Sequence, residues 1–118
     1  MKRVYVAGAL NAKDAVLYIK NMSRMAEWSI KLIRAGYSVF VPGLDFLLGF
    51  KDGNFHYHNY FYNSWWWIKV AEAIFVVPHS EKSKGTRREI EMAKKENIPV
   101  FYSIRDMNRY FKSQEKSK

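Results

Sequence analysis

The chain contains no cysteine, which excludes disulfide bonds, thiolate metal sites and a cysteine nucleophile. No run of about 18 apolar residues occurs, so the sequence predicts no membrane-spanning helix and no membrane partner. Glycine is sparse, with 6 residues, and Gly8 stands alone after the first apolar stretch. Neither a G-x-G-x-x-G fingerprint nor a G-K-[ST] motif is present, so no nicotinamide, flavin or P-loop site is indicated and no cofactor is expected.

Acidic residues are also few, with 11 Asp and Glu against 20 Lys and Arg, and the formal net charge is +9. Such a balance favours an anionic partner: a nucleotide phosphate, a nucleic acid or another acidic surface. Part of the charge lies in residues 113–118, which we interpret as a basic, disordered tail. The apolar part of the N-terminus is short and polar residues follow it, so we expect a strand there rather than a signal peptide. The absence of cysteine fits a cytoplasmic protein, which we expect.

The length of 118 residues suits one compact domain, which we place at residues 1–112. Apolar stretches predict strands at 2–7, 37–41, 73–78 and 100–103, and helical patterns fall at 12–35, 59–71, 85–96 and 104–112. This alternation predicts an α/β fold, a single Rossmann-like (flavodoxin-like) domain whose parallel sheet of four to five strands has helices on both faces. In the first helix, one apolar series recurs at helical spacing and is predicted to face the core: Ala15, Ile19, Met22, Ala26, Ile30 and Ile33.

In sheets of this kind ligands bind at the carboxyl ends of the strands, where the strand order reverses. Three segments are expected to meet there: residues 7–11, the loop that begins at Pro42, and residues 78–86. Residues 44–58 are predicted to form a long loop, because Gly49 and Asp52-Gly53 mark turns. A ligand site at this end of the sheet is therefore predicted.

Glu89 falls one turn inside the helix that follows the third strand, at the border of its apolar stripe. Two interpretations are open. Thr86-x-x-Glu89 matches a capping box, with Thr86 as N-cap and Glu89 reaching back to its N–H. Alternatively, Glu89 is a catalytic carboxylate, because it lies beside the expected pocket and lacks a charge partner at the spacing of helical ion pairs.

Three motifs in order resemble those of the nucleoside 2-deoxyribosyltransferase superfamily: Tyr5-Val6-Ala7-Gly8, Trp67-Ile68-x-x-Ala71-Glu72-Ala73 and Ser83-x-Gly85-x-x-x-Glu89. The resemblance runs from about Lys2 to Ser103. It implies that Glu89 is a nucleophile that attacks the anomeric carbon of a sugar, and that Tyr5 orients it. Substrate-binding positions are then expected at Gly8, Ser83, Gly85 and Thr86.

Ser83 bears on the substrate, because members of this superfamily that cleave nucleoside 5'-monophosphates tend to carry a serine there and transferases an aspartate. A hydroxyl at a helix N-terminus also suits a phosphate, whereas an aspartate would repel it. We therefore expect cleavage of the N-glycosidic bond of a nucleoside or deoxynucleoside 5'-monophosphate through a glycosyl-glutamate. The alternatives are a nucleoside 2-deoxyribosyltransferase, a non-catalytic nucleotide-binding module of the same fold, or a nucleic-acid-binding protein.

Ser64 departs from the family pattern, which usually has an aspartate at this catalytic position. A serine hydroxyl is a poor general acid. The acid could instead come from another titratable residue: Asp45, His58, Glu72 or His79. Of these, Glu72 is better interpreted as a structural group and His79 as a loop residue.

Residues 56–67 are dense in aromatics and end in three consecutive tryptophans. Three such residues point in three directions around a helix, so at most two can face one core. A tryptophan that does not face the core predicts an interface, which agrees with the homo-oligomers that the resemblance implies. A base could stack on Tyr57, Tyr60 or Phe61. His56-x-His58 is a weak metal motif, and no metal is expected.

Overall fold

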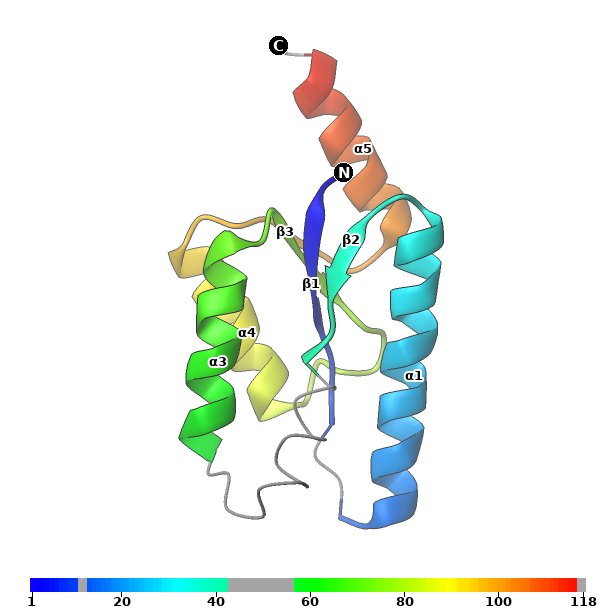
Figure 1. The fold of residues 1–118 in the computed structure, drawn as a ribbon, viewed down its shortest axis with the longest axis vertical. Coiled ribbons are helices and arrows are strands. Elements are labelled where there is room, and N and C mark those ends of the chain that lie inside the picture. Colours follow the sequence, from blue (N-terminus) through cyan, green and yellow to red (C-terminus); the bar gives the residue numbers. More distant parts are fainter. Residues whose placement is uncertain (11–12, 43–56, 117–118) are drawn as a thin grey trace.

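The computed structural model describes residues 1–10, 13–42 and 57–116, without the side chains of residues 57, 58, 60 and 61. Within these residues four strands alternate with four helices (Figure 1). The elements are β1 (Arg3–Ala7), α1 (Ala15–Arg34), β2 (Ser38–Phe40), α3 (Tyr57–Val70), β3 (Ala73–Val76), α4 (Lys84–Lys95), β4 (Val100–Phe101) and α5 (Ile104–Lys116). The predicted α/β class and the predicted elements are confirmed. No helix in this part of the chain is long and apolar enough to cross a membrane.

All strands of the sheet are parallel and lie in the order β2-β1-β3-β4. The chain passes from β1 to β2 on one side and then to β3 on the other, so the order reverses between β1 and β3. Tyr5 in β1 is aligned with Ile74 in β3 at the centre of the sheet. The expected site therefore lies at the carboxyl ends of β1 and β3, as in other open α/β sheets.

Helices cover both faces of the sheet (Figure 1). The alternation of side chains along β1 shows which helices lie on each face. Val4 and Val6 belong to a core cluster with residues of α1 and α5, whereas Tyr5 and Ala7 belong to a second cluster with residues of α3 and α4. Successive side chains of a strand point to opposite faces, which explains the division. Tyr5 is thereby directed to the layer that holds α4.

The predicted core face of α1 is wrong. Ile19, Ile30 and Ile33 are 65%, 49% and 56% exposed, whereas the buried residues of the helix are Asn21, Met25, Ser29 and Leu32. The helix carries two apolar stripes about 100° apart, one residue out of phase. Periodicity finds both stripes, but only contact with the sheet decides between them. A predominantly apolar stripe of α1 is thus left on the surface.

Two helices end in left-handed residues. Gly36 after α1 has φ 97° and Asn97 after α4 has φ 60°. In each case the next residue donates back into the last turn, with Tyr37 N–H bonding Leu32 O and Ile98 N–H bonding Ala93 O. This is the Schellman arrangement. The end of α5 differs from the prediction, because the helix continues past Lys112 to Lys116 and includes most of the expected tail.

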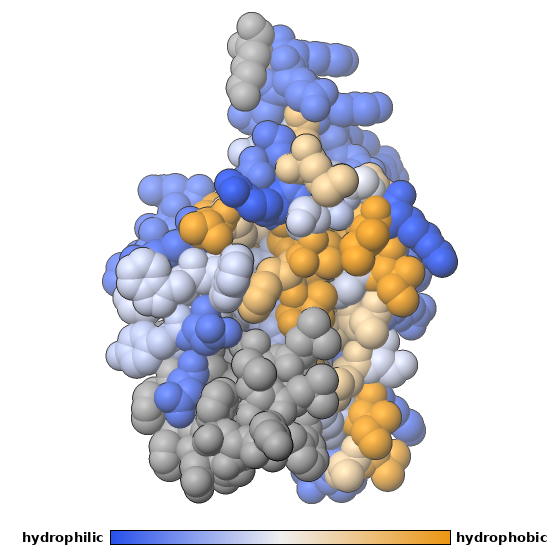
Figure 2. Space-filling view, in the orientation of Figure 1, coloured by the Kyte–Doolittle hydropathy of each residue, from blue (hydrophilic) through white to orange (hydrophobic). Residues whose placement is uncertain are grey.

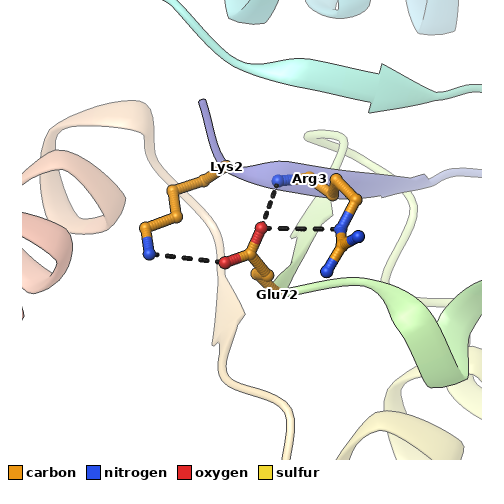
Figure 3. A network of polar contacts seen from close by, with 3 residues as sticks. All are labelled: Lys2, Arg3 and Glu72. Atoms are coloured by element: carbon orange, nitrogen blue, oxygen red, sulfur yellow. Dashed lines mark hydrogen bonds and ion pairs between the residues drawn. The ribbon is translucent and has the colours of Figure 1, made fainter.

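Glu72 joins the amino ends of β1 and β3 (Figure 3). Its carboxylate accepts the backbone N–H of Arg3 at 3.0 Å and lies 3.3 Å from Lys2 Nζ and 3.5 Å from Arg3 Nε. The hydrogen bond from the Arg3 backbone, with Lys2 and Arg3 nearby, lowers the pKa of Glu72 despite partial desolvation. The interpretation of Glu72 as a structural group is confirmed.

Candidate functional site

Glu89 of α4 and Tyr5 of β1 meet above the sheet, although 84 positions separate them in the sequence. The Tyr5 hydroxyl donates a hydrogen bond to Glu89 Oε2. Tyr5 is fully buried, whereas Glu89 is partly exposed, so the hydrogen bond between them lies at the border of the protein interior. Tyr5 is the one polar partner that the described residues give to the Glu89 side chain. The structure thus joins the two residues that the sequence motifs placed in one site.

Burial raises the pKa of the Glu89 carboxyl to about 8, and the hydrogen bond from Tyr5 only partly offsets this. The physical cause is desolvation, which disfavours the charged form of a carboxyl group. A carboxyl with a strongly perturbed pKa at the edge of a sheet is a candidate for chemistry. Once ionised, it is poorly solvated and therefore reactive.

The capping-box interpretation of Glu89 is wrong. The N-cap of α4 is Ser83, whose hydroxyl accepts the N–H of Thr86 at 3.3 Å. The helix therefore begins three residues earlier than a Thr86 cap requires, and Glu89 lies in its second turn. From there its side chain reaches β1 instead of the helix end.

The segments after β1 and β3 are joined at the start of α4, as predicted. Ala9 N–H donates to Ser80 Oγ at 3.0 Å, and Ser83 N–H donates to Ser80 O at 3.0 Å. Ser80 is buried, while the preceding His79 is exposed and has a φ of 68°. Ser80 thereby fixes the loop that presents the helix N-terminus. The third predicted segment, after Pro42, lies outside the described residues.

Gly8 and Gly85 have different surroundings. A Cβ at Gly8 would approach Met25 Cε to 2.8 Å and Val77 to 3.2 Å, so a side chain there would displace the end of the flexible Met25 side chain and press on Val77. A Cβ at Gly85 would meet only Ser83 Oγ, at an ordinary 3.9 Å. The fold does not explain Gly85, which is compatible with a ligand lying against the backbone of α4.

Thr86 is fully buried, and its hydroxyl has no hydrogen-bond partner among the described residues. In this conformation its side chain is closed to solvent. Of the predicted binding residues near the helix N-terminus, Ser83 and Gly85 are therefore the accessible ones, each being partly exposed.

Ser64 lies on the buried face of α3, one turn before Ile68, and is 8% exposed. Ile68 and Ala93 pack in the cluster that contains Tyr5, and Glu89 stands one turn before Ala93 on α4. The helices α3 and α4 run side by side in the same direction, so Ser64 and Glu89 lie on neighbouring helices (Figure 1).

An aromatic stack behind Tyr5 was missed by the sequence reasoning. Phe40 of β2 stacks on Tyr5 with ring centroids 5.6 Å apart, and Trp67 of α3 stacks on Phe40 at 4.8 Å and 16°. These rings hold the Tyr5 ring in place from the side of β2. The sequence did contain a signal for this stack, because Phe40 and Tyr5 both lie in predicted strands. These strands are parallel neighbours in the sheet.

The residues named as replacement acids are not brought together with Glu89. Glu72 is engaged with Lys2 and Arg3 as described, and its lowered pKa makes it a poor proton donor. His79 is exposed in the loop before α4. Asp45, the side chain of His58 and the proposed stacking residues Tyr57, Tyr60 and Phe61 lie outside the described side chains. No group of three or more His, Asp or Glu residues in the described part could hold a metal ion.

Comparison with known proteins gives two matches. The model of a family described as "Domain of unknown function (DUF4406)" matches residues 2–102. Among solved structures, the fold is similar to a 2-deoxyribosyltransferase from the psychrotolerant bacterium Bacillus psychrosaccharolyticus, with a TM-score of 0.64 and 21% sequence identity over 83% of this chain and 69% of that one. A search of curated proteins found no match. At this identity the likeness shows the fold alone.

Proposed function

The chain belongs to the family described as a domain of unknown function (DUF4406), and from its site we propose that it cleaves the N-glycosidic bond of nucleoside 5'-monophosphates, with Glu89 as nucleophile. One observation carries the proposal: the partly buried Glu89 carboxyl meets the Tyr5 hydroxyl beside the point where the strand order reverses. The 2-deoxyribosyltransferase fold of the structural neighbour and the sequence motifs support the same class of chemistry.

The reaction has two steps. The Glu89 carboxylate attacks the anomeric carbon, the bond from this carbon to the base nitrogen breaks, and its electron pair leaves with the base, which takes up a proton. Water then attacks the same carbon, which regenerates the carboxylate and releases the sugar 5-phosphate. The transition states resemble an oxocarbenium ion, and their positive charge favours a nearby carboxylate. The Tyr5 hydrogen bond aims one carboxylate oxygen and leaves the other for the sugar.

The phosphate would bind at the N-terminus of α4. The helix has 12 residues, and the N–H groups of its first turn together with the helix dipole favour an anion. The Ser83 hydroxyl accepts one N–H and still has its own proton to donate. Gly85 allows a phosphate oxygen to approach the backbone. These features support a monophosphate over a free nucleoside.

Ser64 limits how the leaving base is protonated. Its hydroxyl is a poor acid, so the base must take its proton from water or from a group outside the described residues. We therefore expect bases that leave readily, such as purines protonated on the ring, to be released faster than poor leaving groups. Slow turnover is consistent with this arrangement.

The test is chromatographic detection of free base after incubation with ribo- and deoxyribonucleoside 5'-monophosphates and with the matching nucleosides. Glu89→Gln is the inactive variant, and Glu91→Gln, at an exposed glutamate on the same helix, is the matched control. Release from monophosphates that is lost only in Glu89→Gln supports the proposal. An intact-protein mass increase equal to one sugar phosphate would identify the glycosyl-glutamate.

Two other outcomes decide between the alternatives. Base release that requires an added acceptor base would identify a transferase, the activity named for the structural neighbour. No release from any substrate, with nucleotides still raising the melting temperature, would identify a binding module. In that case the serine at position 64 would account for the lost activity.

A further inference from the structure

The exposed stripe of α1 has the spacing of a helix-pairing seam. Its members recur at alternating intervals of three and four residues: Val16, Ile19, Ser23, Ala26, Ile30 and Ile33. The four large members are between 49% and 65% exposed, and the two small members are exposed as well. Figure 2 shows hydrophobic residues at the surface along α1. Alternating spacing of three and four keeps a seam facing one partner helix.

The order of side-chain sizes along this seam is the same in both directions. Two β-branched residues come first, two small residues lie in the middle, and two β-branched residues come last. If a second copy of α1 lies antiparallel, Val16 faces the partner's Ile33, Ile19 faces the partner's Ile30, and Ser23 faces the partner's Ala26. A surface that matches itself after a half-turn is what an isologous two-fold interface requires.

We propose that α1 forms an antiparallel helix pair with α1 of a second copy of this chain, and that the protein is a two-fold dimer through this face. The small residues at the centre let the two helices approach closely where they cross. The β-branched residues fill the space on either side and lose their exposure to water, which stabilises the pair.

Charges beside the seam agree with the antiparallel direction. Lys20 and Glu27 lie seven residues apart on one flank of the stripe, and both are exposed. In an antiparallel pair this flank of one helix faces the same flank of the partner helix. Glu27 therefore comes near the partner's Lys20 on each side of the two-fold axis. In a parallel pair this flank would face the opposite flank of the partner, so Glu27 would not come near the partner's Lys20. Opposite charges across the flank specify orientation more than they add affinity.

The aromatic surface of α3 is the competing candidate for the interface. Trp66 is 67% exposed and Val70 is 50% exposed. Here, however, Lys69 Nζ lies 4.7 Å from the Trp66 ring centroid and 4.8 Å from that of Trp65. A lysine over the rings keeps a charge in the middle of the surface. We therefore favour α1, which has no charged residue within its seam.

Substitution of Ile30 by lysine tests the seam, with Val70→Lys as the matched control. Both positions are exposed β-branched residues on helices, at 49% and 50% exposure. We expect the wild type and Val70→Lys to have twice the chain mass of 14.0 kDa in light scattering and Ile30→Lys to have the single mass, with at least a 100-fold weaker dimer. Circular dichroism verifies that each variant folds. A monomeric wild type at 100 µM, or a dimer that only Val70→Lys disrupts, would overturn the proposal.

Engineered cysteines test the direction of the pair, and the absence of native cysteine leaves no background. Val16→Cys and Ile33→Cys are oxidised separately and as a mixture. In the antiparallel pair each position is about 25 Å from its own copy, at about 1.5 Å per residue, so neither variant cross-links alone. The mixture should give one disulfide-linked dimer. Cross-linking of Val16→Cys with itself, or none in the mixture, would refute the antiparallel arrangement.

Discussion

Burial raises the pKa of the Glu89 carboxyl from its ordinary 4.5 to about 8 in the folded protein, so stability is expected to depend on pH through this residue. The folded state binds the proton more tightly, and its stabilisation is complete below pH 4.5 and lost as the pH rises through 8. Glu89→Gln should match the wild type near pH 5 and exceed it near pH 9 by a few kcal/mol, roughly 5–15 °C in Tm. Thermal melts from pH 5 to 9 measure this, and Glu91→Gln should show no such gain.

The same group should set the pH dependence of the reaction. Only the ionised carboxylate can attack, so kcat/KM is expected to rise with pH and to level off above an apparent pKa near 8, the value for Glu89 in the free protein. The hydrogen bond from Tyr5 lowers the pKa of Glu89, so Tyr5→Phe should move the rising limb to higher pH. Tyr37→Phe removes a buried hydroxyl from the opposite layer and should leave the profile unchanged. A flat profile between pH 6 and 9 would argue against Glu89 as nucleophile.

At the scale of the helix, the start of α4 combines a structural task with a proposed binding task. Ser83→Asp separates the two, because aspartate is as good an N-cap as serine but brings a negative charge to the phosphate position. We expect Tm to change by only a few degrees while kcat/KM for monophosphates falls at least tenfold relative to that for nucleosides. The ratio of the two kcat/KM values is the measurement. An unchanged ratio would mean that the phosphate binds elsewhere.

Gly85 gives a second test at the same helix end. Alanine fits there without a clash and favours a helix by up to about 1 kcal/mol, so Gly85→Ala should raise Tm. If the phosphate approaches the backbone at this position, the added methyl group should raise KM several-fold. Gly36→Ala is the contrast, because φ of 97° there makes alanine destabilising. A variant with higher Tm and unchanged KM would remove Gly85 from the site.

At this scale, the sequence predicted well those features that depend on interactions between residues close together in the chain. Apolar runs and helical spacing identified the elements, since these features act over a few residues. The face that α1 buries could not be predicted, because two apolar stripes compete and only the sheet selects one. The interpretation of Glu89 depended on where α4 begins: a cap at Ser83 instead of Thr86 directs the carboxyl to Tyr5.

At the scale of the whole molecule, part of the basic charge lies away from the candidate site. An open groove on α5 is lined by Arg105, Asn108, Arg109, Lys112, Ser113 and Lys116. Figure 1 shows α5 projecting past the end of the sheet where β1 begins, whereas α4 starts at the carboxyl ends of the strands. The net charge of +9 therefore does not by itself indicate what the site binds.

This separation predicts how salt acts on a nucleotide substrate. One phosphate at α4 releases few counterions, so kcat/KM should fall less than about tenfold between 50 and 500 mM NaCl, whereas a nucleic acid held by many phosphates would lose about a thousandfold or more. Replacing Arg105, Arg109 and Lys112 with glutamine should leave nucleotide cleavage within about twofold, because these side chains lie on α5 and not beside Glu89. Steady-state rates with the two proteins across the salt range provide the measurement. A steep salt dependence that disappears in the α5 variant would instead indicate that the substrate reaches along this helix, as a polynucleotide would.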